Sequence, residues 1–97
     1  MLLDRVLAAF SRSGVRLLEQ VRAAQHEGDM QDLRLTVHTL RSSAASIGAL
    51  TLSRLCADVE IRLGQESIAG LRGRLDELDS EGRRVLEALS AGAGATT

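Results

Sequence analysis

The sequence contains no proline, tryptophan or tyrosine, and Phe10 is its single aromatic residue. Proline breaks helices, so a chain of 97 residues without it can run in long uninterrupted helices. Leu, Ala, Arg and Glu, which are good helix formers, are abundant. Without large aromatic side chains, the core must be built from Leu, Val and Ile packed between helices. The composition therefore predicts one all-α domain.

Three further absences exclude classes of protein. Charges of both signs are interspersed, with 12 Lys and Arg against 13 Asp and Glu, so the clustered basic face of a nucleic-acid-binding protein is missing. No apolar run approaches the roughly 18 residues that span a bilayer, and Asp4 and Arg5 interrupt the apolar start that a signal peptide requires. Cys56 is the only cysteine, which excludes an intramolecular disulfide. We therefore expect a cytoplasmic protein that binds neither nucleic acid nor membrane.

Apolar residues at helical spacing predict a first helix over residues 2–25 and a second over residues 30–47. The segment 11–14 (Ser-Arg-Ser-Gly) interrupts the first pattern and predicts a kink or a break there. Gly28 is expected to end the first helix in the left-handed conformation, and Asp29 to cap the second. The second helix has the most regular apolar stripe, formed by Met30, Leu33, Val37, Leu40, Ala44 and Ile47.

Two more helices are predicted in the second half of the chain. Thr51 is expected to cap a third helix, and a fourth is expected to begin near Glu66 or Ser67. The segment 91–97 consists of Ala, Gly and Thr, has nothing to bury and is expected to be a disordered tail. The chain should therefore form a monomeric up-down four-helix bundle over residues 1–90.

The outer face of the second helix carries the most informative residues. At about 100° per residue, His38 lies roughly 130° from the centre of the apolar stripe and should point to solvent or to a partner. Leu35 lies roughly 170° from the stripe, so an apolar side chain is also expected on the outside. The helical neighbours of His38 lie three and four positions away. They form a candidate docking surface of Arg34, Leu35, Ser42 and Ala45, with Arg41 beside it.

The segment 37–49 (Val-His-Thr-Leu-Arg-Ser-Ser-Ala-Ala-Ser-Ile-Gly-Ala) resembles the signature of histidine-containing phosphotransfer (HPt) domains. That signature has a His, a Leu two positions later and a basic residue three positions later, followed by small residues and a Gly-Ala pair. Further along, Leu52, Cys56 and Glu60 match positions that the family often fills with Leu, Cys and an acidic or amide residue. The resemblance covers the second and third predicted helices in detail.

The resemblance implies a role for each of three residues. His38 would be phosphorylated, Arg41 would be the cation beside the phosphoryl group, and Glu60 would hydrogen-bond the other imidazole nitrogen. The implied function is that of a phosphorelay intermediate without kinase activity of its own. Its partners would be aspartyl-phosphate receiver domains of response regulators and a hybrid histidine kinase. No cofactor is expected, because Mg²⁺ belongs to the receiver.

The chain departs from the family pattern at Ser42, where Gly is common. A non-catalytic helical adaptor, which binds a receiver domain without phosphotransfer, is the alternative function, and Ser42 gives it weight. Arg34 and Glu60 are also typical of a solvated helix surface. Cys56 is explained by the apolar face on which it lies, and His26 by a favourable interaction with a helix dipole.

Enzyme and metal sites of three kinds are excluded. An autokinase needs an ATP-binding domain, for which the chain has neither the length nor a glycine-rich phosphate motif. The dimerisation helix of histidine kinases typically has an acidic residue after the His and a later Pro, whereas Thr39 follows His38 and the chain has no Pro. A zinc site made of His26, His38 and Cys56 fails on the number and spacing of ligands. We therefore expect no metal site.

Overall fold

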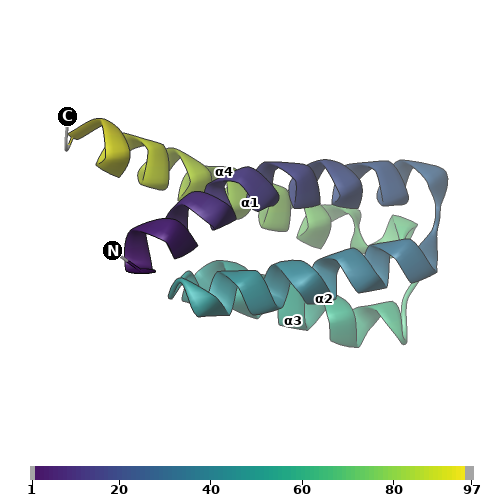
Figure 1. Ribbon diagram of the computed structural model, residues 1–97. Coiled ribbons are helices and arrows are strands. Elements are labelled where there is room, and N and C mark those ends of the chain that lie inside the picture. Colours follow the sequence, from purple (N-terminus) through teal and green to yellow (C-terminus); the bar gives the residue numbers. More distant parts are fainter. Residues whose placement is uncertain (1, 96–97) are drawn as a thin grey trace.

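The computed structural model describes the backbone of residues 2–95 and the side chains of residues 4–91. It contains four α-helices, one short 3-10 helix and, over the described residues, no strand. The elements are α1 (Leu2–Glu27), α2 (Met30–Ser46), α3 (Leu50–Leu63), η1 (Ala69–Leu71) and α4 (Arg72–Ala95) (Figure 1). No helix in this part of the chain combines the length and the apolarity needed to cross a membrane.

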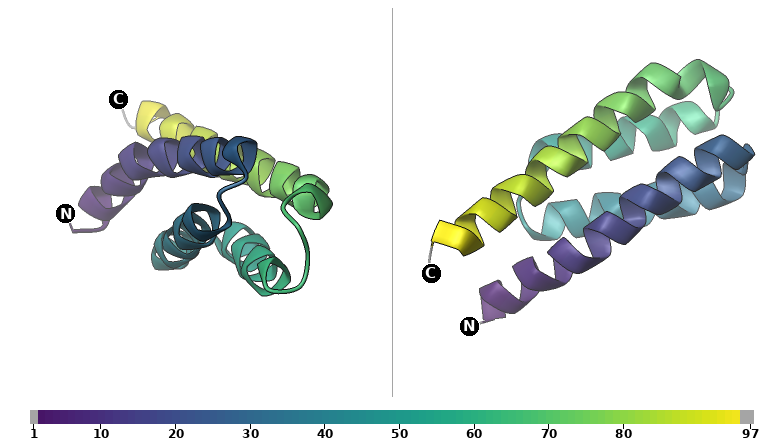
Figure 2. Two further views of the ribbon diagram at one scale, coloured as in Figure 1. Left: turned by 90° about the vertical axis from the view of Figure 1, so that its right-hand side faces the viewer. Right: turned by 90° about the horizontal axis from the view of Figure 1, so that it is seen from above.

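The helices form a bundle in which each helix runs antiparallel to the next one along the chain (Figure 1). α1 and α4 lie side by side in one layer, and α2 and α3 form the other (Figure 2). Contacts join α1 to α2, α2 to α3, α3 to α4 and α4 back to α1, which closes the ring around one core. The start of α1 and the end of α4 project together beyond α2 and α3 (Figures 1 and 2). The predicted up-down four-helix bundle is confirmed.

The core is aliphatic, as the composition predicts. Phe10 is the one aromatic side chain in it, and Thr36 is the one buried polar side chain of the described residues. The predicted apolar stripes of all four helices meet there. The largest fully buried side chains are those of Leu33, Val37, Leu40, Leu52, Cys56, Val59, Leu71, Leu75 and Leu78.

α1 is one continuous helix through residues 11–14, so the predicted break between two helices is wrong. The hydroxyl of Ser13 donates to the carbonyl of Ala9 at 2.8 Å, which lets a serine sit inside a helix. Gly14 is buried, and a Cβ built on it would lie 3.0 Å from Cδ2 of Leu86 on α4. This glycine therefore serves close packing between helices, which outweighs its low helix propensity.

Gly82 gives α4 the matching close contact with α1. A Cβ built on Gly82 would lie 2.7 Å from Cδ2 of Leu18, closer than real side chains approach. The distance between two packed helices depends on the side chains at their contact. A hydrogen in place of a side chain at both glycines allows α1 and α4 to approach closely where Gly14 and Gly82 lie.

The ends of α1 and α2 follow the predicted capping. Gly28 (φ 71°) and Gly48 (φ 78°) adopt the left-handed conformation that ends a helix. Asp29 caps α2, because its carboxylate accepts a hydrogen bond from the backbone N–H of Asp32 at 3.0 Å.

The predicted cap of α3 is wrong. α3 begins at Leu50, one residue before Thr51, and Ala49 takes the N-cap position without a side-chain hydrogen bond. The backbone N–H of Ala49 still bonds to the carbonyl of Ala44 at 2.9 Å, which belongs to the end of α2. The turn between α2 and α3 therefore consists only of residues 47–49.

α4 begins at Arg72, later than the predicted start at Glu66 or Ser67. The hydroxyl of Ser67 accepts a hydrogen bond from the N–H of Gly70 at 3.1 Å, in the turn that leads into η1, whose N-cap position is Ile68. The short helix η1 therefore occupies the segment just before α4, where the pattern predicts the fourth helix itself.

The end of α4 also differs from the prediction. The helix continues to Ala95, so the structure places residues 91–95 in a helix where the composition predicts a disordered tail. Alanine is the best helix former, and it alternates here with glycine, which weakens a helix without ending it. The remaining part of the predicted tail, residues 96–97, lies outside the described residues.

Candidate functional site

His38 lies on the outer face of α2, where the helical phase predicts it. Thr36, Val37 and Leu40 are buried, and they fix the rotation of α2 about its axis. The His38 side chain is 54% exposed, so a partner can approach the imidazole. Leu35 is 66% exposed, which confirms the unusual outward position of this apolar side chain.

Glu60 on α3 contacts the imidazole of His38. Because Cys56, Val59 and Leu63 are buried, Glu60 lies on the flank of α3 that faces α2, and only 18% of its side chain is exposed. Its Oε1 lies 3.1 Å from Nδ1 of His38. A carboxylate oxygen only accepts, so Nδ1–H is the donor in this hydrogen bond. The structure thus contains the contact that the resemblance implies.

This hydrogen bond decides which imidazole nitrogen can react. A neutral imidazole carries one N–H, and its other nitrogen carries the free lone pair. When Nδ1 holds the proton and donates it to Glu60, the lone pair lies on Nε2. His38 therefore presents its nucleophilic nitrogen on the side of the ring away from Glu60.

Arg41 lies on the Nδ1 side of the same ring. Its Nη2 is 3.3 Å from Nδ1 of His38, and its Nη1 is 3.5 Å from Oε2 of Glu60. One guanidinium therefore contacts both partners of the His38–Glu60 hydrogen bond. The cation implied by the resemblance is close to His38, but it lies beside Nδ1 rather than beside Nε2.

Arg34 contacts a different part of α3. Its Nη2 donates to the backbone carbonyl of Leu63 at 3.2 Å, in the last turn of α3, where carbonyls lack a partner within the helix. Arg34 also lines a shallow hollow of about 350 Å³ together with Gln31, Leu35, His38 and Glu60. The hollow places an apolar side chain and a cation next to the imidazole.

Ser42 and Ala45 complete the exposed strip on α2. Both side chains are small, so they leave the approach to His38 open from their side. The carbonyl of Ser42 accepts a hydrogen bond from Oγ of Ser46 at 3.0 Å. The structure therefore brings the four predicted docking residues, among them Arg34, onto one face around His38.

Sequence reasoning missed two residues of this face. Gln31 lines the hollow, and Oγ of Ser53 donates to the backbone carbonyl of Arg41 at 3.4 Å, which ties α3 to the turn that carries this arginine. Their spacing holds a usable signal. Gln31 lies four positions before Leu35 and seven before His38, and Ser53 lies seven positions before Glu60. Each therefore shares a helix face with the site.

Cys56 is a core residue, as predicted. Burial, assisted by the negative charge of Glu60 and opposed by Arg41, raises the pKa of its thiol to about 12. The thiol therefore stays protonated and unreactive near neutral pH. No group of three or more His, Cys, Asp or Glu side chains within the described part of the chain is arranged to hold a metal ion.

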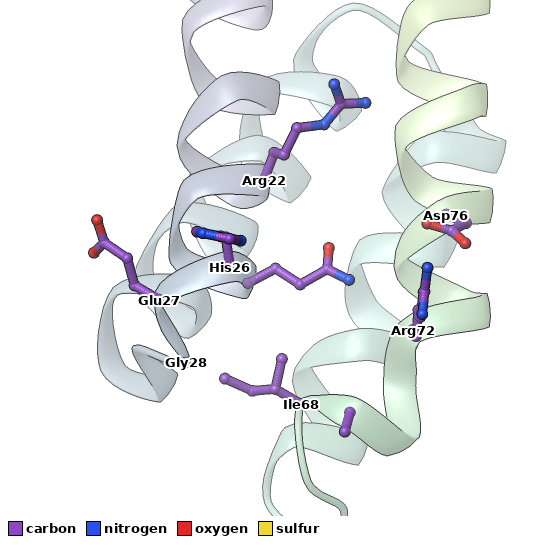
Figure 3. Close-up of a pocket in the computed structure, with 9 residues that line it drawn as sticks. Arg22, His26, Glu27, Gly28, Ile68, Arg72 and Asp76 are labelled. Carbon is purple, nitrogen blue, oxygen red and sulfur yellow. The ribbon is translucent and has the colours of Figure 1, made fainter.

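A larger hollow, of about 630 Å³, lies between the end of α1 and the start of α4 (Figure 3). Figure 3 shows Arg22 and His26 on one helix and Arg72 and Asp76 on the other. The two arginines are balanced by the carboxylates of Asp76 and Glu27, so no net charge attracts an anion to this hollow. Size therefore does not identify the site, and we assign the chemistry to the smaller hollow on α2 and α3.

Comparison with known proteins agrees with this fold. The family profile described as Hpt domain matches residues 5–92. A crystal structure of the HPT domain from a Hpt sensor hybrid histidine kinase from Shewanella has the same fold, with a TM-score of 0.87 and 24% sequence identity over 94% of this chain and 79% of that one. No curated protein matches the chain. The chain therefore belongs to the Hpt domain family, whose members carry phosphoryl groups in phosphotransfer relays.

Proposed function

We propose that the chain is a phosphorelay intermediate that carries a phosphoryl group on Nε2 of His38. The observation that carries the proposal is the exposed imidazole whose Nδ1 is hydrogen-bonded to Glu60 at 3.1 Å. That contact favours the tautomer with a free lone pair on Nε2. The partners are receiver domains of response regulators, including one that belongs to a hybrid histidine kinase.

The transfer step needs little from the protein besides position and charge. The Nε2 lone pair of His38 attacks the phosphorus of an aspartyl phosphate, the N–P bond forms, and the O–P bond breaks to release the aspartate carboxylate. The ring then carries a positive charge, because Nδ1 keeps its proton. Glu60 stabilises this charge through the hydrogen bond it already makes. The reverse step returns the phosphoryl group to the aspartate of a second receiver.

The exposed strip of α2 supports the choice of partner. Leu35 offers an apolar contact, Ser42 and Ala45 are small, and Arg34 supplies a cation beside the hollow. Only one carboxylate, that of Glu60, lines this hollow, and it is already engaged by two other side chains. Mg²⁺ prefers several oxygen ligands, so in this proposal the receiver supplies it and the chain itself uses no cofactor.

The proposal treats the chain as a monomer in the cytoplasm. The single cysteine supports this placement, because Cys56 is a buried free thiol that makes no disulfide. The closed ring of four helices supports a monomer, since each helix already packs on two neighbours.

Mixing the chain with a receiver that carries radioactive phosphate tests the proposal. We expect label to move to the chain and to be lost in acid but not in alkali, as is typical of phosphohistidine. A receiver whose acceptor aspartate is replaced by asparagine is the control, and it should transfer no label. Stable binding to the phosphorylated receiver without transfer would contradict the proposal and would favour the non-catalytic adaptor.

A further inference from the structure

We infer that Arg41 is a positioning residue that acts on His38 through Glu60, in the state before the phosphoryl group arrives. The inference rests on the proposed function of His38, and it adds a role for the ion pair beside Nδ1. Both terminal nitrogens of its guanidinium lie close to the His38–Glu60 pair: Nη1 is 3.5 Å from Oε2 of Glu60, and Nη2 is 3.3 Å from Nδ1 of His38.

The burial of Glu60 explains why it needs Arg41. A carboxylate that is only 18% exposed has lost most of its water and must find partners in the protein. Oε1 contacts the imidazole, which is neutral when it is a nucleophile, and Oε2 contacts the guanidinium. Arg41 is therefore the only cation in these contacts that offsets the charge of Glu60. Without it, the carboxylate would gain by turning toward solvent, and Oε1 would leave Nδ1.

The contacts of Nδ1 show how Arg41 affects the tautomer of His38. Glu60 and Arg41 are both close to Nδ1, but one nitrogen cannot donate to the carboxylate and accept from the guanidinium at once. If the lone pair were on Nδ1, the carboxylate oxygen would face it at 3.1 Å, which is repulsive. A proton on Nδ1 satisfies Glu60, leaves Arg41 paired with Oε2, and frees Nε2.

The guanidinium is held in this place by its surroundings. The Arg41 side chain is 37% exposed, and its backbone carbonyl accepts a hydrogen bond from Ser53 on α3. The buried thiol of Cys56 lies close to the same pair, since the charge of Glu60 raises the pKa of the thiol and that of Arg41 lowers it. The ion pair therefore borders the apolar core, where it is screened less by solvent than a surface pair.

Arg34 provides the matched control. It lies on the same helix and lines the same hollow, but its guanidinium bonds to the carbonyl of Leu63 and not to Glu60 or Nδ1. Loss of its charge removes a cation from the face of α2 without touching the ion pair.

The first test observes the tautomer directly. Long-range ¹H–¹⁵N spectra of the full chain distinguish the protonated from the unprotonated ring nitrogen of His38. We expect the Nδ1–H form to dominate in the parent, in Arg41→Lys, which keeps the charge, and in Arg34→Gln. In Arg41→Gln we expect a mixture of both tautomers. An unchanged tautomer in Arg41→Gln would overturn the inference, whatever the rate of phosphotransfer.

The second test separates action through Glu60 from action on the phosphoryl group. Phosphoramidate phosphorylates the chain without a docked protein. The bond from Nε2 of His38 to phosphorus forms, the P–N bond of phosphoramidate breaks, and the departing nitrogen takes up a proton and leaves as ammonia. We expect Arg41→Gln to slow this reaction about tenfold, as a misplaced reacting group does. In a Glu60→Ala background the same change should have almost no further effect, because linked residues are non-additive.

The outcomes of the second test are distinct from a failure of the proposed function. An equal factor in both backgrounds would mean that Arg41 acts directly on the phosphoryl group, which would overturn the inference and leave the role of His38 intact. If the parent chain takes no phosphoryl group on His38, the proposed function itself is wrong.

Discussion

The two helices of one layer are joined by different kinds of contact from the two helices of the other. α2 and α3 are joined across their outer faces by polar contacts, from Arg34 to a backbone carbonyl and from His38 and Arg41 to Glu60. α1 and α4 are joined by close packing at two glycines and by an ion pair between Arg22 and Asp79 at 3.2 Å.

The difference shows how a small helical domain separates stability from chemistry. Close apolar packing stabilises a fold strongly, whereas exposed ion pairs contribute little, about 0–1 kcal/mol each. The apolar packing inside the bundle can therefore carry the fold while the polar contacts on the outer faces of α2 and α3 set the geometry of His38. Substitutions at the contact between α1 and α4 and on the outer face of α2 should accordingly affect different measurements.

The largest expected effect is on phosphorylation, and it separates the two histidines. His38→Gln should abolish labelling by a phosphorylated receiver and leave the circular dichroism spectrum and the melting temperature unchanged, because the side chain lies outside the core. His26→Gln, at the end of α1, should be labelled like the parent. Undiminished labelling of His38→Gln would show that another residue accepts the phosphoryl group.

The next largest effect should be on stability alone. Gly82→Leu should lower the free energy of unfolding by about 1–3 kcal/mol, because the side chain collides with the buried Leu18. Gly73→Leu on the same helix is the control, since a Cβ there meets nothing within 4 Å. Thermal melts should show destabilisation in Gly82→Leu only. At 25 °C the labelling rate of both variants should match that of the parent, and a slower rate would contradict the separation of stability from chemistry.

A third change should weaken receiver binding and spare stability. Leu35→Glu should raise the Kd for the receiver about tenfold, because a carboxylate would be desolvated at an apolar contact without a partner. Val15→Glu is the matched control, as Val15 is an exposed apolar residue on α1. Calorimetric titration and melting curves together decide the matter. A large loss of helicity in Leu35→Glu would show that Leu35 is needed by the fold and not by the receiver.

The smallest effect is expected at Ser42, where the chain departs from its family. Ser42→Gly should lower stability by up to about 0.5 kcal/mol, since glycine is the poorer helix former, and leave transfer similar or faster. Ser42→Phe should fold but block the approach to His38, whereas Ser80→Phe on the exposed side of α4 should not. Stopped-flow experiments on all three variants measure the rate of phosphotransfer. Transfer by Ser42→Phe as fast as in the parent would mean that the receiver does not cross this face.

The phase of the apolar pattern made the buried and exposed faces of α2 predictable. The apolar stripe from Met30 to Ile47 fixes which side of α2 is buried, so the exposure of His38 and Leu35 follows from spacing alone. The pairing of His38 with Glu60 did not follow from spacing, because the two residues lie on different helices, and it came from the family resemblance.

Packing and local turn geometry limited the other predictions. The segment that contains Gly14 looks like a break, but the glycine serves a contact with α4 that no local pattern reveals. α4 begins at Arg72 and not near Ser67, because the sequence does not show that the short helix η1 comes first. The position of Arg41 beside Nδ1 was also beyond prediction, since a long side chain on a known helix face can still turn toward either nitrogen of the ring.

The central claim is that Nε2 of His38 receives the phosphoryl group. It is tested most directly by phosphorylating the ¹⁵N-labelled chain with a receiver and recording which ring nitrogen couples to phosphorus. We predict coupling to Nε2 of His38, with Nδ1 still protonated and bonded to Glu60. Coupling to Nδ1, or to either ring nitrogen of His26, would contradict the account.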